Sequence, residues 1–244
     1  MAESTERPAF YALASGGWRD YWTLLHPPYT VWHLSYVVIG TTLVDRVNVR
    51  WLGETTAAFF LAVGVAAHAL DELRGRPLRT SIPDRTLWAL AAGGVAGAVA
   101  LGIHGALVLG PWTGAFIVVG GFLVIAYNLE LLGGRFHSDL WFALAWGGFP
   151  ALTGFFAQTG TVTGAAVLVA AACVAFSAAQ RVLSTPVRRL RRRVVRIEGS
   201  LQTGEGSSQP IDRRTLLAAP ESGLRLLSLA MPLLAGGLLL ARLI

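Results

Sequence analysis

The sequence predicts an all-α protein, a polytopic transmembrane bundle of about seven helices. Hydrophobic residues make up 54% of its 244 residues, whereas charged residues make up only 14%. A helix needs roughly 20 mostly apolar residues to cross a bilayer. The approximate stretches that meet this need are 29–45, 51–70, 86–109, 112–132, 139–157, 161–183 and 222–243. Composition and stretch length together indicate an integral membrane protein.

The segments outside these stretches complete the expected organisation. Near the start, aromatic residues stand beside Arg19 and Asp20, a mixture typical of a helix that lies in the plane of the membrane surface. After the sixth stretch comes a basic run and then a flexible Gly/Ser/Gln-rich segment. The expected parts are an N-terminal interfacial segment (1–28), a transmembrane bundle (29–190), a basic and flexible cytoplasmic loop (191–221) and a C-terminal transmembrane helix (222–244).

Charge predicts the orientation of the bundle. All twenty basic residues are arginine, and most lie in alternate connecting segments. Because basic residues are retained on the cytoplasmic side, we expect a cytoplasmic N-terminus in a bacterial or archaeal cytoplasmic membrane. The same rule accounts for the net charge of +6 without nucleic acid as a partner. The absence of lysine excludes Schiff-base chemistry, and the lone Cys173 cannot form an internal disulfide.

The first polar cluster closes the second expected span, in the sequence HALDELRGRPLR. His68 and Asp71 are three residues apart and share a helix face, and Glu72, Arg76 and Arg79 follow. Carboxylates suit Mg²⁺, and guanidinium groups suit phosphate. We therefore expect catalytic and metal-binding roles for the two acids, and substrate binding by the histidine and the arginines. The alternative is a salt-bridge network that anchors the end of the helix.

The second cluster ends the fourth expected span. Tyr127, Asn128 and Glu130 lie there in an otherwise apolar sequence that breaks at two glycines. A carboxylate at this depth is costly without a partner, and Arg135 is the nearest candidate. We expect catalytic roles for the first three residues. Asp139, further on, suits the first turn of the next helix.

The third cluster ends the sixth expected span. Gln180, Arg181 and Ser184 are spaced to share one helix surface, and Pro186 is expected to break or kink the helix that follows. If the guanidinium of Arg181 faces the bundle, it can bind a diphosphate together with Gln180. If it faces lipid, it extends to the headgroups.

Three segments carry a family resemblance: LLHPPYTVWHLSYVVIGTTL, HALDELRGRPLRTSIP and YNLELLGG with the following LWFALAWGGFPALTG. In order and spacing they resemble the UbiA superfamily of intramembrane prenyltransferases over roughly residues 22–190. The resemblance implies a helical bundle that binds an isoprenoid diphosphate through Mg²⁺ at two acidic motifs. Only Asp71 coincides with an acidic position of the first motif, and residues 180–184, at the second, contain no carboxylate.

Two functions follow from this resemblance. The first is a prenyltransferase-type enzyme that acts on an isoprenoid diphosphate at the cytoplasmic rim, where arginines replace the charge of a lost metal ion. The second is a non-catalytic relative that binds membrane lipids or another lipid substrate, or assembles with a membrane-protein partner. A transporter is a third class, but the sequence contains no internal repeat of the kind that transporters show.

Overall fold

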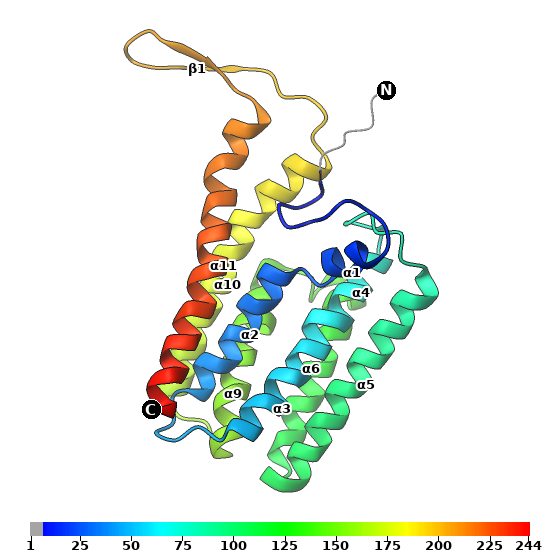
Figure 1. Cartoon of the computed structure of the whole chain (residues 1–244), viewed down its shortest axis with the longest axis vertical. Helices are drawn as coiled ribbons and strands as arrows, with labels where there is room; N and C mark the ends of the chain where they lie inside the picture. Colours follow the sequence, from blue (N-terminus) through cyan, green and yellow to red (C-terminus); the bar gives the residue numbers. More distant parts are fainter. Residues whose placement is uncertain (1–6) are drawn as a thin grey trace.

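The computed structural model describes residues 7–244, so the first six residues of the expected interfacial segment lie outside it. The described chain is helical apart from one short hairpin (Figure 1). The first half contains α1 (Trp18–Leu24), α2 (Pro27–Thr41), α3 (Val49–Phe59), the π-helix η1 (Phe60–Ala67), α4 (His68–Leu73), α5 (Asp84–Leu109) and α6 (Trp112–Asn128). The second half contains α7 (Leu131–Gly134), α8 (Asp139–Ala143), the π-helix η2 (Leu144–Gly148), α9 (Phe149–Thr159), α10 (Gly164–Arg192), β1 (Ser200–Gln202), β2 (Ser208–Pro210) and α11 (Arg213–Leu243).

These elements form one helical rod at each of the seven apolar stretches. The rod of α3, η1 and α4 is continuous, as is the rod of α8, η2 and α9. Five rods in the described chain are long and apolar enough to cross a membrane, namely 49–73, 84–109, 139–159, 164–192 and 213–243. The prediction of a multi-pass helical membrane protein is confirmed at this level. Helices α2, with 15 residues, and α6, with 17, are shorter, so the count of seven spans stays a prediction.

Two helices extend beyond the rest of the bundle. Helix α10 passes through Pro186 and ends only at Arg192, so of the break or kink expected at this proline, the break is wrong. A proline inside a helix leaves the carbonyl of the residue four positions earlier without its donor, and that residue, Val182, is 72% exposed. Helix α11 begins at Arg213, and the segment between the two helices carries the antiparallel hairpin of β1 and β2 (Figure 1).

Glycines bring the central helices into close contact. A Cβ atom on Gly40 of α2 would lie 1.8 Å from the carbonyl oxygen of Ala151 in α9, and a Cβ atom on Gly154 of α9 would lie 2.2 Å from the carbonyl oxygen of Val37. Small residues allow this approach, which is a common way for membrane helices to associate. The crossing of α2 and α9 therefore depends on the absence of side chains at these positions.

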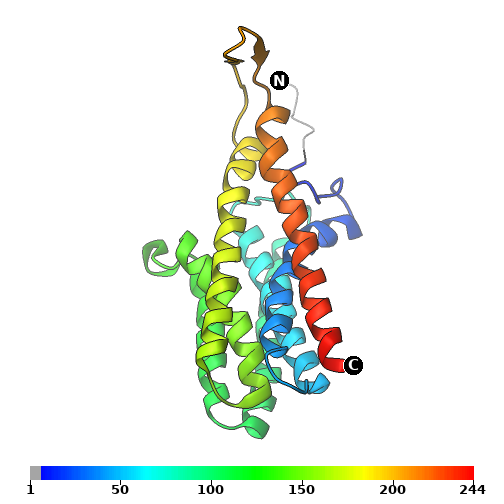
Figure 2. The ribbon, with the colours of Figure 1, turned by 90° about the vertical axis from the view of Figure 1, so that its left-hand side faces the viewer.

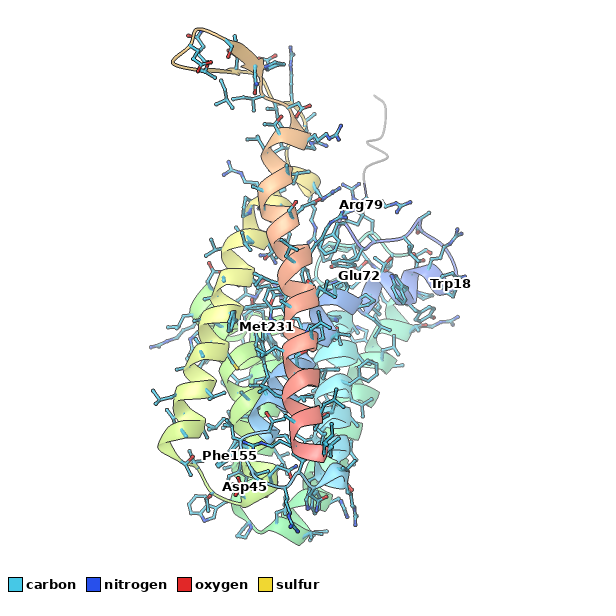
Figure 3. The ribbon with its side chains drawn as sticks, turned by 60° about the vertical axis from the view of Figure 1, so that its left-hand side comes forward. Trp18, Asp45, Glu72, Arg79, Phe155 and Met231 are labelled. Atoms are coloured by element: carbon cyan, nitrogen blue, oxygen red, sulfur yellow. The ribbon has the colours of Figure 1, made fainter. Side chains whose placement is uncertain are left out.

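The two ends of the bundle differ in character. The hairpin lies at one end and the C-terminus at the other (Figure 2). Glu72, Arg79 and Trp18 lie toward the hairpin end, whereas Asp45 and Phe155 lie toward the opposite end (Figure 3). The polar sequence clusters therefore gather at the hairpin end.

Candidate functional site

A polar cavity of about 210 Å³ lies at the hairpin end of the bundle. Its walls come from α2, α4, α6 and α10, and residues 8–11 of the N-terminal segment contribute to its lining. The sequence-predicted residues that line it are His68, Asp71, Tyr127, Asn128, Gln180 and Arg181. The three clusters, which are far apart in the sequence, thus meet in a single space. The amide nitrogen of Asn128 donates to the carbonyl oxygen of Val124 at 2.7 Å, which fixes this side chain.

Glu72 does not line this cavity, although it is adjacent to Asp71 in the sequence. Its side chain is completely buried and accepts three hydrogen bonds. The backbone N–H groups of Leu78 and Thr80 each donate to it at 2.9 Å, as does the Thr80 hydroxyl. The structure therefore gives Glu72 an anchoring role for the loop between α4 and α5, in place of the catalytic and metal-binding roles expected from the sequence.

Three more sequence-predicted residues lie outside the cavity lining. The carboxylate of Glu130 pairs with Arg74 at 3.0 Å rather than with the expected Arg135, because Glu130 follows the end of α6 in a left-handed conformation with φ 51°. Arg76 pairs with Asp84. The backbone of Arg79 also has a positive φ, of 57°, and this residue is exposed.

Helix α1 also holds the α4–α5 loop. Both the backbone N–H and the hydroxyl of Ser81 donate to the carboxylate of Asp20, which also accepts from the backbone N–H of Gly16. Burial alone would raise the pKa of Asp20, but these hydrogen bonds outweigh it and hold the pKa below its usual value. The loop is therefore fastened by two carboxylates from different elements, Glu72 and Asp20.

Four arginines line the cavity: Arg74, Arg181, Arg188 and Arg192. The guanidinium of Arg181 pairs with Asp139 at 2.6 Å and lies 5.0 Å from the ring centre of Phe142, so it faces the bundle rather than lipid. Asp139 thus pairs with α10 as well as suiting the first turn of α8. Arg188 forms no ion pair among the described residues, and its guanidinium donates a hydrogen bond to the Thr185 hydroxyl at 3.4 Å.

Four histidines also line the cavity: His26, His33, His68 and His137. The rings of His26 and His68 lie with their centres 4.1 Å apart and their planes tilted by 34°, and the ring centre of His137 lies 4.5 Å from that of Tyr127. The Nε2 atom of His33 faces the amide oxygen of Gln180 at 3.0 Å. The cavity therefore combines guanidinium, imidazole and amide groups, and Asp71 is the only carboxylate among the described residues that line it.

Residues 8–11 cover part of the cavity. The ring of Tyr11 lies 5.3 Å from His26 and 5.4 Å from Tyr29, measured between ring centres. Burial raises the pKa of Tyr11 above its usual value, so its phenol stays protonated. Arg192 donates to the carbonyl oxygen of Pro8 at 3.4 Å, and the guanidinium of Arg225 lies 5.0 Å from the ring centre of Phe10. Contacts from α10, α11 and α2 hold this segment in place.

An apolar groove adjoins the polar cavity. Its volume is about 130 Å³, and it lies among α3, η1, α5, α6 and the η2–α9 rod. Val63 and Trp146 line both spaces. Both residues belong to the π-helices η1 and η2, a kind of helix that is rare and frequent at functional sites.

The sequence analysis missed Arg188 and Arg192 as well as the cavity histidines His26, His33 and His137. One signal was present for Arg188: it lies seven residues after Arg181 and four after Ser184, so it continues their helix face. No sequence pattern indicated that residues 8–11 would cover the site.

No protein-family model, curated protein or solved structure matches this chain.

Proposed function

We propose that this chain is a UbiA-like membrane enzyme that binds an isoprenoid diphosphate and transfers its prenyl group. In this proposal the diphosphate occupies the polar cavity and the prenyl chain enters the adjoining apolar groove. The observation that carries the proposal is Arg188, a half-buried guanidinium that lines the cavity without an acidic partner among the described residues. A partly desolvated charge is costly unless an anion neutralises it.

The size and chemistry of the two spaces suit such a ligand. Arg74 and Arg181 are already paired with Glu130 and Asp139, whereas Arg188 and Arg192 line the cavity without an acidic partner among the described residues. Two such guanidinium groups favour an anionic ligand, and the guanidinium fork matches phosphate oxygens. The shared residues Val63 and Trp146 make the polar and apolar spaces neighbours. An amphipathic ligand can place its anionic head in the polar cavity and its long apolar chain in the apolar groove.

The arginines supply the chemistry that prenyl transfer needs. The bond between the allylic carbon and the diphosphate oxygen breaks, and its electron pair leaves with the diphosphate. Donors that are already oriented toward the leaving group stabilise this developing charge. Arg188 and Arg181 serve this purpose here, while Asp71 stands where its negative charge stabilises the allylic cation. Tyr127 and Asn128 form the wall nearest the second substrate.

The donor set does not fit a Mg²⁺ ion held by the protein. Mg²⁺ binds through one or two carboxylates together with substrate phosphates, but Asp71 stands among arginines and both oxygens of Glu72 are occupied by the α4–α5 loop. No group of three or more His, Cys, Asp or Glu side chains in the described chain could hold a metal ion. We therefore assign the charge of the lost metal to the arginines, and Arg181 keeps the substrate-binding role predicted for it.

A non-catalytic lipid-binding or assembly partner is the second candidate. The observation that favours it is the lone carboxylate in the cavity, because an enzyme that has lost its acidic motifs can retain its binding space. In both cases we propose a cytoplasmic location for the cavity, on the side where the basic end of α10 lies.

Binding of geranylgeranyl diphosphate to the purified protein in detergent tests the proposal. We compare wild type with Arg188→Gln, and use Arg189→Gln as the matched control, because Arg189 is exposed on the same helix. Loss of a charge-assisted contact worth about 1.5–3 kcal/mol weakens binding roughly 10- to 100-fold in the Arg188 variant only. Each measurement is made with and without Mg²⁺, and with geranylgeraniol in place of the diphosphate.

The outcomes separate the two candidates. Arginine-dependent binding followed by consumption of the diphosphate supports the enzyme. The same binding without consumption, in the presence of a panel of acceptors, supports the lipid-binding partner. If neither variant alters binding, or if geranylgeraniol binds equally well, the diphosphate site is wrong.

A further inference from the structure

The segment that precedes α1 is folded as a cap over the polar cavity. It lies at the hairpin end of the bundle, where Figure 1 draws it in dark blue, and its residues 8–11 line the cavity. The backbone N–H of Ala12 donates to the carbonyl oxygen of Ala9 at 3.2 Å, which closes a turn. The backbone N–H of Leu13 donates to the Thr23 hydroxyl at 3.0 Å. These bonds fold the segment against the bundle, and Ala12 is completely buried.

The arginine-rich end of α10 holds this cap. Arg192 donates to the carbonyl oxygen of Pro8 at 3.4 Å, and Arg191 donates to that of Arg7 at 3.3 Å. Arg192 also lines the cavity, as does Arg188 one turn earlier. One helix end therefore positions both the cap and the guanidinium groups that face the cavity.

Tyr11 is the residue through which the cap brings a hydrogen-bond donor to the cavity. Its ring packs against the rings of Phe10, His26 and Tyr29. Its hydroxyl forms no hydrogen bond with any residue that the structure describes. A buried tyrosine hydroxyl normally has a partner, so this one requires a ligand or a water molecule.

The charges around this hydroxyl indicate what kind of ligand fits. Burial raises the pKa of Tyr11, so the phenol is neutral and can donate, although Arg192 and Arg188 lie close enough to oppose this rise. A guanidinium group has no acceptor atom, so a ligand group placed among the phenol and the two arginines must accept hydrogen bonds. A phosphate group has the acceptor oxygens and the negative charge that this position requires.

We propose that the Tyr11 hydroxyl donates a hydrogen bond to the diphosphate of the ligand, beside Arg188 and Arg192, so that the N-terminal segment covers the bound anion. This inference rests on the proposed function and adds a binding residue to it. Tyr11 precedes the part of the chain that resembles the UbiA superfamily, roughly residues 22–190, so the resemblance does not imply this contact. A covered anion is also less exposed to water, which strengthens each of its hydrogen bonds.

The variant Tyr11→Phe tests this contact, because it removes the hydroxyl and keeps the ring that packs in the cap. Tyr21→Phe is the matched control, since Tyr21 is 43% exposed on α1 and does not line the cavity. Calorimetric titration of the detergent-solubilised proteins measures the binding of geranylgeranyl diphosphate, inorganic diphosphate and geranylgeraniol. Thermal unfolding without ligand measures the stability of the three proteins.

The Tyr11 variant is expected to bind both diphosphates about tenfold more weakly than wild type, which corresponds to the loss of one hydrogen bond to a charged group. The Tyr21 variant matches wild type, and geranylgeraniol binds all three proteins equally because it has no phosphate. Without ligand, the three proteins unfold at the same temperature.

Three results overturn the inference. The first is an equal diphosphate affinity in all three proteins. The second is an equal weakening for geranylgeraniol in the Tyr11 variant, because the residue would then contribute packing alone. The third is a lower unfolding temperature of that variant without ligand, because the hydroxyl would then already have a partner in the protein.

Inorganic diphosphate separates this inference from the proposed function. If it binds in a Tyr11-dependent manner and the wild type does not bind geranylgeranyl diphosphate, the contact with the anion stands and the proposed function is wrong. If geranylgeranyl diphosphate binding depends on Arg188 but not on Tyr11, the proposed function stands and the inference is wrong. If the wild type binds neither diphosphate, both are wrong.

Discussion

Adjacent acidic residues have different roles in this protein. Asp71 lines the cavity, whereas the side chain of Glu72 is buried outside it and holds the α4–α5 loop. The helix turns by about 100° per residue, and at this position the turn carries Glu72 out of the cavity that Asp71 lines. The same geometry explains why His68 and Asp71, three residues apart, lie in one site.

Replacement of Glu72 tests its anchoring role. Glu72→Ala leaves the backbone N–H groups of Leu78 and Thr80 buried without an acceptor, and we expect a loss of about 3 kcal/mol of stability. Glu130→Ala is the control, because its exposed ion pair with Arg74 is worth less than about 1 kcal/mol. Thermal unfolding of the detergent-solubilised proteins measures both. Equal melting temperatures for the two variants would contradict the anchoring role.

At the scale of single residues, the sequence predicted which residues line the cavity better than it predicted which residues form ion pairs with one another. Six predicted residues line the cavity, since helix periodicity determines which side chains share a face. The partner of Glu130 was wrong because it depends on where α6 ends and on the left-handed turn that follows. Arg74 and Glu130 are 56 positions apart in the sequence. A contact between residues so far apart produces no local sequence pattern from which it could be predicted.

At the scale of helices, close packing decides how the bundle is held together. Helices α2 and α9 approach each other through Gly40 and Gly154, where a Cβ atom would overlap the facing backbone. Helix α2 also carries His33 into the cavity. The position of His33 in the cavity therefore depends on the close contact that Gly40, on the same helix, makes with α9.

Substitution of Gly40 is expected to displace α2 from α9. Gly40→Leu destabilises the protein by about 3 kcal/mol, because neither backbone can move without loss of other contacts. Gly53→Leu is the matched control, since a Cβ atom at Gly53 meets no other atom within 4 Å. Thermal unfolding and size-exclusion chromatography check both variants. A Gly40 variant as stable as the Gly53 variant would show that the helices can separate at little cost.

The existence of the helices was predictable because long apolar stretches have few alternatives in a membrane. The residues at which the helices begin and end were less predictable. Of the break or kink expected at Pro186, the break was wrong, and α11 begins nine residues before the expected boundary of 222. Proline is tolerated in membrane helices when the freed carbonyl group finds another partner or is open to its surroundings, and composition alone does not reveal that.

At the scale of the whole molecule, the two ends of the bundle are expected to face different compartments. Cysteine labelling in intact cells tests this orientation. We expect Glu205→Cys, in the hairpin, to react with a membrane-impermeant maleimide only after the cells are permeabilised, because arginine-rich ends remain in the cytoplasm. Val162→Cys, exposed between α9 and α10 at the other end, reacts without permeabilisation. The native Cys173 is buried and gives the background. The reverse pattern would invert the topology.

The common wall of the polar cavity and the apolar groove, formed by Val63 and Trp146, has a practical consequence for any lipid ligand. Such a ligand need not enter bulk water to reach the site, so its effective concentration is its mole fraction in the bilayer or micelle. Each additional portion of detergent dilutes the ligand on this surface while its bulk molarity stays constant. Apparent affinities will therefore fall as detergent is added, and comparisons between variants are meaningful only at a fixed ratio of ligand to detergent.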